Sequence, residues 1–412
     1  MEHKTQVSRT LLPLLVSLVL CLTFLGVGEC FAWTGGIVGD GGVILHTYGM
    51  SAWFAQTSGT TNNLHDIAFA DTNTAWAVGD GGVIRHTTNS GTTWTAQTSG
   101  TTNNLWGVFF VDSLSGWIVG DGGIIRRTTN GGTTWSTQTS GTSFRLYKVT
   151  FQSPNIGWAV GDQGVILYTP NGGGLWILQT SGTTSDLYGI SFINTTAGFV
   201  VGNGSTTLRT TDGGTNWVLR AQPPGAQNVW GVSALNVNTA WIAGYGYGGG
   251  DWGGQIWNTT DGGGSWVFQR LVRGTSFRSI SFIDSLRGWS VGNGGAILRT
   301  TTGDSVWTTQ PSGTPNTLWA VTFTNIPPSS GVEETAGVRD QGLGIRVTAR
   351  PNPFASFAAI PGHEAERFAV YDVSGRQVGT YKGDRIGEGL SPGVYFVGAH
   401  GRAPLLRIVK VR

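Results

Sequence analysis

The chain has 412 residues, of which only 12% are charged, and its formal net charge is +2 at pH 7. This balance argues against nucleic acid as a partner, because phosphate binding needs a concentrated basic face, and nothing in it suggests binding to a membrane surface. The 67 Gly and 18 Trp, with abundant Thr, indicate an all-β protein with many tight turns, since glycine adopts positive φ readily and Trp and Thr favour strands.

Residues 1–32 have the pattern of a secretory signal peptide. Lys4 and Arg9 supply the positive start, and residues 11–27 form an apolar run that is too short for a confident transmembrane span. Small residues precede the expected cleavage site after Ala32. The mature chain is therefore expected to begin close to the next residue, outside the cytoplasm.

Both cysteines, Cys21 and Cys30, lie inside this segment. A lipoprotein signal is the weaker alternative, because Leu20 and Glu29 stand where a small residue should precede the lipidated cysteine. The mature chain is left without a thiol, so neither a disulfide framework nor a cysteine-ligated metal site is expected.

Residues 33–324 repeat one pattern. One unit, from Leu105 onward, reads "LWGVFF", "GWIVG", "GIIRRTT" and "TTWSTQTS", which predicts four short strands joined by turns. A tryptophan closes each unit, at even spacing except for one longer step: Trp53, Trp94, Trp135, Trp176, Trp217, Trp266 and Trp307. Seven units of four strands predict a seven-bladed β-propeller.

The two ends of the repeat region are complementary. Residues Trp33 to Ser58 supply the second, third and fourth strands of a unit, whereas Leu318 to Thr324 supplies only a first strand. An open stack would leave two incomplete sheets with exposed edges, which natural β proteins avoid. We therefore expect the two fragments to complete one blade and close the ring.

Two turns recur in the units. "VGDGG" follows the second strand and predicts a two-residue Asp-Gly hairpin with positive φ at both central positions. After the third strand, "TTNGGTTW" resembles the Asp-box hairpin of sialidases and other propellers, and Thr259 to Trp266 matches it most fully. We expect these residues to hold a hairpin whose Trp fills space between the sheets.

The combined pattern "GW-x-VG-D/N-x-G" and "TT-x-G-G-x-x-W" resembles the photosystem II stability and assembly factor family of seven-bladed propellers. The resemblance implies the propeller fold. Members of that family are thought to engage partners through an arginine-bearing surface, so it also implies a binding role. Fold alone does not assign function, which depends on a site.

Catalysis of the sialidase type needs a Tyr activated by a Glu, a carboxylic general acid and an arginine cluster. Residues 33–324 contain no Glu, most Asp residues occupy turns, and no loop has calcium-binding spacing. We therefore predict a monomeric, non-catalytic binding module for a surface protein or glycan, without metal or cofactor. A sialidase-like glycoside hydrolase and an envelope complex assembly factor are the alternatives.

The first candidate binding site is a partly basic collar on one rim of the ring. It consists of the residues six positions after each turn Asp or Asn, which are His46, His86, Arg127, Tyr168, Arg209 and Arg299, with Asn258 in the corresponding place of the sixth unit. The simpler interpretation, which we favour, is a set of solvated residues at strand ends.

Two further groups are candidates. The second position of each first strand carries His65, Trp106, Tyr147, Tyr188, Trp230, Arg278 and Trp319. Strict alternation places them on the face of a buried Val or Ile, which predicts inter-blade core rather than an aromatic ligand ring. The insertion "YGYGGGDWGGQ" predicts a glycine-rich loop whose Tyr245, Tyr247 and Trp252 could stack on sugar rings or a protein, or have no function.

The C-terminal part changes character. Residues 325–346 have the composition of a linker, and residues 347–412 contain short alternating strands such as "FAVYDVSGRQV" and "LSPGVYFV". This small immunoglobulin-like β-sandwich pattern resembles the type A C-terminal sorting domain of the type IX secretion system, and also the flagellar hook-capping family. With the signal peptide, the resemblance implies recognition by secretion machinery and a protein secreted from, or displayed on, a diderm bacterium.

Overall fold

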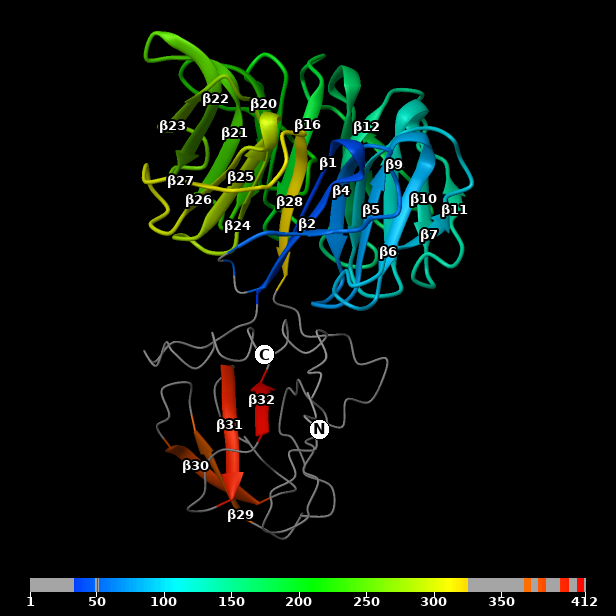
Figure 1. The fold of residues 1–412 in the computed structure, drawn as a ribbon, viewed down its shortest axis with the longest axis vertical. Coiled ribbons are helices and arrows are strands. Elements are labelled where there is room, and N and C mark those ends of the chain that lie inside the picture. Colours follow the sequence, from blue (N-terminus) through cyan, green and yellow to red (C-terminus); the bar gives the residue numbers. More distant parts are fainter. Residues whose placement is uncertain are drawn as a thin grey trace, which may run out of the picture. The chain divides into compact units, whose positions relative to one another are not determined.

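The computed structural model describes residues 33–48, 50, 52–324, 367–371, 377–382, 393–399 and 406–410. The chain divides into two compact units, Met1–Ser329 and Ser330–Arg412. In the first unit, seven four-stranded antiparallel sheets form a closed β-propeller (Figure 1). The expected signal peptide and linker lie outside the described residues. None of the described residues belongs to a helix long and apolar enough to cross a membrane.

Each blade consists of four consecutive strands, the first of which lies next to the central axis. Blades 1 to 3 are β4 (Leu64–Phe69), β5 (Ala75–Gly79), β6 (Val83–Thr87), β7 (Thr95–Thr98); β8 (Leu105–Phe110), β9 (Gly116–Gly120), β10 (Ile125–Thr128), β11 (Ser136–Gln138); β12 (Leu146–Phe151), β13 (Gly157–Gly161), β14 (Ile166–Thr169), β15 (Ile177–Gln179). Blades 4 to 6 are β16 (Leu187–Phe192), β17 (Gly198–Gly202), β18 (Thr207–Thr210), β19 (Val218–Leu219); β20 (Ala226–Ala234), β21 (Ala240–Gly248), β22 (Asp251–Thr259), β23 (Val267–Arg273); β24 (Phe277–Phe282), β25 (Gly288–Gly292), β26 (Ile297–Thr300), β27 (Thr308–Gln310).

Blade 7 joins the two ends of the repeat region. It combines β28 (Leu318–Thr324) with β1 (Thr34–Gly39), β2 (Ile44–Tyr48) and β3 (Phe54–Gln56), in the order β28-β1-β2-β3. The β28–β1 register runs from Thr34↔Thr324 to Val38↔Ala320. The predicted completion of one blade by both fragments is therefore confirmed, and every sheet of the ring has four strands.

Aromatic side chains fill the space between blades. Trp76 of β5 is fully buried and stacks on Phe110 of the next blade, with centroids 3.5 Å apart and planes inclined by 7°. The same pairing recurs between other blades as Trp117–Phe151, Trp158–Phe192 and Trp241–Phe282. Burial of these large rings between sheets explains why a blade is stable only beside its neighbours.

A glutamine on the outermost strand bonds each of several blades to the next. Gln138 of β11 accepts a hydrogen bond from the Trp176 indole (3.1 Å) and donates one to the Gly172 carbonyl (3.1 Å). Equivalent indole-to-glutamine bonds join Trp53 to Gln310, Trp94 to Gln56 and Trp217 to Gln179. The repeated "QTSG" glutamine is thus an inter-blade contact.

The Asp-box hairpins lie between the third and fourth strands, as predicted. Between β22 and β23, Thr259 Oγ1 donates to Asp261 Oδ1 (2.8 Å), and the same carboxylate accepts from the Ser265 amide (2.9 Å). These bonds lower the pKa of Asp261. Trp266 at the end of the hairpin is buried, so the residues have the structural role that was expected.

The "VGDGG" turn differs from the two-residue hairpin predicted. It is a short 3-10 turn, η1 (Asp40–Gly42) in blade 7, in which positive φ falls on Gly41 (67°) and Gly42 (75°) and not on Asp40. Similar turns are η2 (Asp80–Gly82), η3 (Asp121–Gly123), η4 (Asp162–Gly164) and η5 (Asn293–Gly295). The Asp precedes the left-handed positions, so its side chain is free to contact the first strand of its blade.

The C-terminal unit contains a four-stranded antiparallel sheet in the order β30-β29-β31-β32. Its strands are β29 (Arg367–Tyr371), β30 (Gln377–Lys382), β31 (Gly393–Ala399) and β32 (Leu406–Lys410). Strands were expected in this region. The second layer of a sandwich would have to come from residues outside those described, so the sandwich stays a prediction.

The inter-blade glutamine gives a stability prediction. Gln138→Leu should lower the free energy of unfolding by about 1–3 kcal/mol, because the Trp176 indole and the Gly172 carbonyl both lose their partner. Urea unfolding of the full chain measures this change. The control is Gln222→Leu, at an exposed glutamine whose one side-chain bond is long, 3.4 Å to the Gly204 carbonyl. Equal stability of the two variants would contradict the assignment.

Candidate functional site

A β-bulge recurs near the start of every first strand. In blade 2, Leu105 pairs with Gly120 and Gly107 pairs with Val119, so Trp106 is an extra residue with no partner on β9. The same irregularity occurs in all seven blades at His65, Trp106, Tyr147, Tyr188, Trp230, Arg278 and Trp319. A bulge interrupts the two-residue alternation of a strand and re-aims the side chain.

These seven side chains form a closed ring around the axis, which we call the axial ring. The stacked pair His65–Trp106 has centroids 4.0 Å apart, and the circuit continues through Trp106–Tyr147 (5.8 Å), Tyr147–Tyr188 (5.1 Å), Tyr188–Trp230 (6.4 Å), Trp230–Arg278 (4.2 Å), Arg278–Trp319 (4.9 Å) and Trp319–His65 (5.4 Å). His65 is buried and the other six are half-buried.

The axial ring lies at one end of a central channel. The first strands of all the blades line this cavity of about 680 Å³, and every member of the axial ring contributes to its wall. The sequence predicted that these residues belong to the core between blades. The bulge explains the difference, because it breaks the alternation on which that prediction depended and turns the side chains toward the axis.

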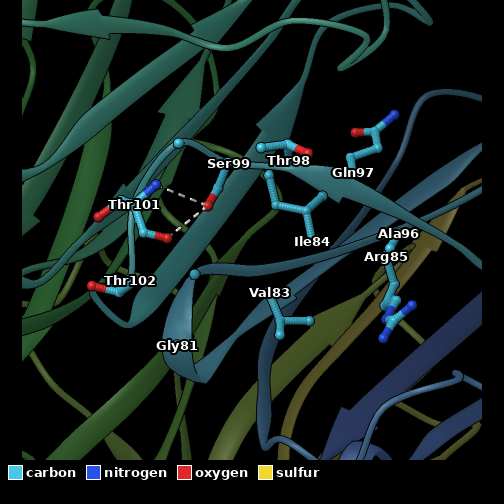
Figure 2. A pocket seen from close by; sticks show the side chains of 12 residues that line it. Gly81, Val83, Ile84, Arg85, Ala96, Gln97, Thr98, Ser99, Thr101 and Thr102 are labelled. Atoms are coloured by element: carbon cyan, nitrogen blue, oxygen red, sulfur yellow. Dashed lines mark hydrogen bonds between the residues drawn. The ribbon is translucent and has the colours of Figure 1, made fainter.

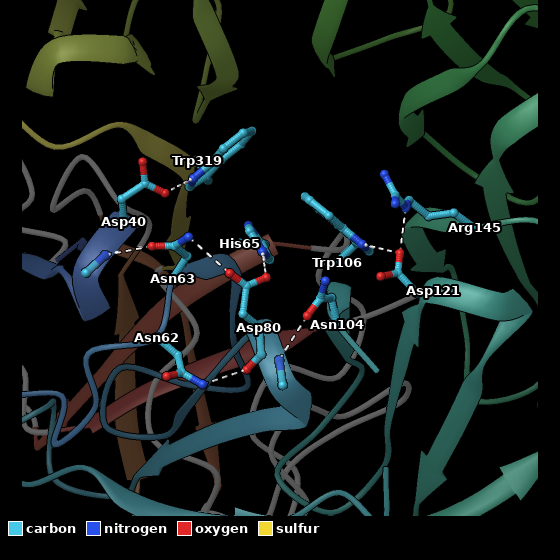
Figure 3. Close-up of polar contacts among 12 residues, drawn as sticks. Asp40, Asn62, Asn63, His65, Asp80, Asn104, Trp106, Asp121, Arg145 and Trp319 are labelled. Atoms are coloured by element: carbon cyan, nitrogen blue, oxygen red, sulfur yellow. Dashed lines mark hydrogen bonds and ion pairs between the residues drawn. The ribbon is translucent and has the colours of Figure 1, made fainter. Parts of the chain in front are cut away.

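The turn carboxylates hold members of the axial ring in place (Figure 3). Asp80 lies 2.7 Å from His65 Nε2, and the Trp106 indole donates to Asp121 (2.8 Å). In blade 3, burial and a hydrogen bond with Asp162 raise the pKa of Tyr147. The recurring turn Asp therefore orients a ring side chain, a role that the turn alone did not predict.

Asparagines bond neighbouring blades at the same end of the channel. Asn63, just before β4, accepts from the Gly41 amide of blade 7 (2.9 Å) and donates to Asp80 (3.0 Å). Asn104, just before β8, accepts from the Gly81 amide of blade 1 (2.9 Å). Figure 3 shows these hydrogen bonds around the ring residues. The bonds fix the geometry of the channel mouth, the end that carries the axial ring, before any ligand binds.

An ion pair joins the residues that directly follow the bulges of blades 1 and 3. The Asp66 carboxylate is buried and contacts Lys148 Nζ of blade 3 at 2.6 Å, and it also accepts from the Val108 amide of blade 2 (2.9 Å). Gly107 lies between them, where a Cβ would stand 2.8 Å from the Tyr147 carbonyl. Absence of that side chain lets the neighbouring first strands β8 and β12 approach closely.

The collar residues lie on the third strands, opposite the second strands. Arg127 pairs across from Trp117 and its guanidinium lies 5.5 Å from that ring, while Arg299 lies 5.4 Å from Trp289. The other members, His46, His86, Tyr168, Arg209 and Asn258, occupy equivalent register positions. No ring contact, hydrogen bond or ion pair among the described residues joins two collar members. None of the seven is exposed, since His46 is buried and the other six are half-buried, so the interpretation as solvated residues is not confirmed. Their role in binding stays a prediction.

The insertion near Tyr245 is a strand extension and not the loop that was predicted. β21 and β22 pair along their whole length up to Gly248↔Asp251, with positive φ at Gly249 (59°) and Gly250 (86°). Trp252 stacks on Tyr245 (5.6 Å) and contacts Tyr247 (5.3 Å). Tyr247 and Trp252 are 50% and 42% exposed, so the hairpin presents an aromatic surface. The hairpin takes the place that the short turn after the second strand, such as η3, has in other blades. It therefore lies at the same end of the channel as the axial ring.

Shallow grooves also occur between the third and fourth strands. In blade 1 a groove of about 620 Å³ is lined by residues of β6, β7 and the following turn, where Ser99 Oγ bonds to Thr101 (Figure 2). A related groove of about 980 Å³ occupies the equivalent place in blade 7. Polar groups of the blade 1 groove already bond to backbone groups, Ser99 to Thr101 and Arg85 to the Gly59 carbonyl, so the grooves are weaker candidates than the channel.

Metal binding finds no support in the described residues, where no three His, Cys, Asp or Glu side chains gather. The ring region instead offers aromatic faces, two tyrosine hydroxyls and the Arg278 guanidinium. That arrangement suits reversible contact with a ligand.

The family model for the photosynthesis system II assembly factor YCF48 matches residues 45–139 and 98–179, which is less than half of the chain. Among solved structures, "YCF48 bound to D1 peptide" has a TM-score of 0.53 at 20% identity, covering 63% of this chain and 84% of that one. YCF48 from Cyanidioschyzon merolae gives 0.54 and 20%, covering 65% and 90%.

The GH74 xyloglucanase from Xanthomonas campestris is also similar in structure, with a TM-score of 0.50 at 14% identity, covering 67% of this chain and 46% of that one. No curated protein matches the chain significantly. At these identities the solved structures show the fold, a seven-bladed propeller similar to YCF48. They do not assign the chemistry of the channel.

Burial of His46 gives a pH prediction. The His46 side chain packs against Tyr48 and is only 3% exposed. This burial lowers the pKa of His46 to about 4, below the ordinary 6.5. The unfolded chain therefore binds a proton below about pH 6.5 that the folded chain takes up only near pH 4, so stability is lost as the pH falls through this window. Between pH 7.5 and 5.0 this loss should be about 2 kcal/mol.

Urea unfolding at the two pH values measures the effect. His46→Gln should remove most of that pH dependence, whereas His86→Gln, at a half-buried histidine whose pKa is also lowered by burial, should remove less. If the two variants behaved alike, His46 would not be the residue that resists protonation.

Proposed function

We propose that this propeller is a non-catalytic binding module for a protein or glycan, and that its ligand contacts the axial ring. The observation that carries the proposal is the bulge that recurs in every blade and turns aromatic side chains into the channel mouth. Half-buried aromatic rings held by neighbours provide a large contact area at low entropic cost on binding.

Structures with the same fold are known with both ligand classes. One similar propeller, YCF48, is described as bound to a D1 peptide, and another similar structure is a xyloglucanase. These likenesses support a propeller that binds either a protein or a glycan. The residues of the axial ring must decide between the two classes.

The acidic groups of the ring region favour binding over hydrolysis. Asp66 pairs with Lys148, Asp80 bonds His65, and Asp121 bonds both Trp106 and Arg145. A glycosidase needs one carboxyl group whose pKa is raised so that it can donate a proton. Here Lys148, Arg145 and the Trp106 indole can only donate hydrogen bonds, so Asp66 and Asp121 act as acceptors. A sialidase-like hydrolase remains the alternative function. Because a xyloglucanase has a similar fold, the experiment below also assays hydrolysis.

Binding should depend on the axial ring. Screening the full chain on glycan arrays and against surface proteins should identify a ligand whose affinity falls at least about tenfold in Trp230→Ala. Trp230 is chosen because its indole makes no hydrogen bond within the described residues, whereas those of Trp106 and Trp319 do, so its removal breaks no hydrogen bond of the ring. Sialidase and xyloglucan substrates assayed in parallel should show no turnover.

Two variants test the other candidate places. Arg127→Ala in the collar and Trp252→Ala in the blade 5 hairpin should change affinity much less than Trp230→Ala. Loss of binding only in one of these variants would move the site there. Turnover would favour the hydrolase, and stable co-purification with a membrane complex would favour the envelope assembly factor.

We also propose that the protein acts outside the cell, after Sec export and a type IX-like step. The signal pattern in residues 1–32 and the strand pattern after residue 347 support this route. N-terminal sequencing of the exported protein should find a start near Trp33. Removal of residues 347–412 should leave the propeller in the periplasm, and normal release of that truncated protein would contradict the sorting role.

A further inference from the structure

Arg278 is the one member of the axial ring without an aromatic ring. It occupies the bulge of β24, and its guanidinium carbon lies 4.2 Å from the Trp230 centroid and 4.9 Å from that of Trp319. Its Nε donates to Asn293 Oδ1 at 3.0 Å. Burial lowers the pKa of Arg278, but a guanidinium remains protonated in proteins. A positive charge is therefore held in a partly dry aromatic site.

Two other cations close to the axial ring have carboxylate partners. Arg145 Nε lies 2.5 Å from Asp121, and Lys148 Nζ lies 2.6 Å from Asp66. Within the described part of the chain, Arg278 belongs to no ion pair, and its hydrogen bond uses only Nε. The two terminal nitrogens of the guanidinium thus remain for a ligand.

The turn of blade 6 explains why Arg278 lacks a partner. Asn293 stands where the turns of blades 7, 1, 2 and 3 carry Asp, and a neutral amide can accept a hydrogen bond without cancelling the charge. Asp40 attracts Arg278 through space without forming an ion pair with it, and its carboxylate accepts a hydrogen bond from the Trp319 indole at 2.6 Å. Arg278 is therefore a cation of the channel mouth that no described carboxylate contacts directly.

We propose that the axial ring binds an acidic saccharide, with a hexuronate carboxylate on Arg278 and the sugar ring against the neighbouring aromatic faces. The inference rests on the proposed function and names its ligand class. A partly desolvated guanidinium gains most from a carboxylate that can accept two parallel N–H bonds. Trp230 and Trp319 flank the guanidinium and supply flat apolar surfaces for a pyranose.

The inner strands favour a saccharide over a peptide. A peptide that adds as a strand needs free backbone groups on a sheet edge. Here side chains already occupy several inner-edge amides: Asp66 accepts from Val108, Ser191 from Ala234, Ser233 from Phe282 and Ser279 from Val321. Recognition therefore falls to side-chain faces and to Arg278, and these suit a sugar acid.

Calorimetric titration of the full chain with trigalacturonate and with a hyaluronan tetrasaccharide tests the inference, and fully methyl-esterified trigalacturonate is the neutral control. At least one acid should bind, and its ester should bind at least about tenfold more weakly. Arg278→Gln should remove that preference. Arg299→Gln, which changes an arginine that also lies over a tryptophan but outside the channel, should keep it.

Asn293→Asp separates charge from folding. It keeps Arg278 and supplies the carboxylate that blade 2 provides to Arg145, so uronate affinity should fall at least about tenfold in a folded protein. Equal binding of acid and ester, no uronate binding, or tighter binding of an acidic peptide would each overturn the inference. If the inference of an acidic saccharide failed but a neutral glycan or a protein still bound in a way that depended on Trp230, the proposed function would remain supported. Binding that ignored Trp230 would refute both.

Discussion

The propeller depends on contacts between neighbouring blades at three distances from the axis. On the outside, Gln138 joins β11 to the Asp-box turn of the next blade. In the middle, tryptophans of second strands stack on phenylalanines of the next blade, as Trp117 does on Phe151. Near the axis, Gly107 allows close approach of neighbouring first strands. Together these contacts set the angle between sheets, and closure by β28 and β1 requires every angle to agree.

A repeated scaffold with one variable position gives the channel mouth its chemistry. The bulge places a side chain toward the axis in each blade, and the turn residue after the second strand holds it. Trp106 bonds to Asp121 and Arg278 bonds to Asn293 in the same arrangement. In the first pair the turn residue carries the charge, which is negative, and in the second pair the ring residue carries it, which is positive. The blades that depart from the average unit therefore carry more information about the ligand than the blades that conform to it.

The sequence predicted most of the fold because the repeat combines strand alternation, turn residues and closing tryptophans in one short period. It also predicted blade 7 from its two fragments, since incomplete sheets must pair. It considered an aromatic ring at the first-strand positions but favoured inter-blade core, because a bulge of one residue leaves no mark in a pattern of apolar positions. The contact of Asp80 with His65 was missed for another reason, because the sequence analysis assigned the Asp of Asp-Gly to the turn alone. The hairpin of blade 5 was taken for a loop because its glycines hid the pairing of Tyr247 with Trp252.

Closure of the ring also decides where the polypeptide enters and leaves it. β28 begins beside Trp319 at the axial ring and ends at Thr324, which pairs with Thr34 at the start of β1. Both connections to the rest of the chain therefore emerge together at the far end of the channel. The rim that carries the axial ring is thus free of both chain connections, and only the opposite rim is used to join the propeller to the rest of the polypeptide.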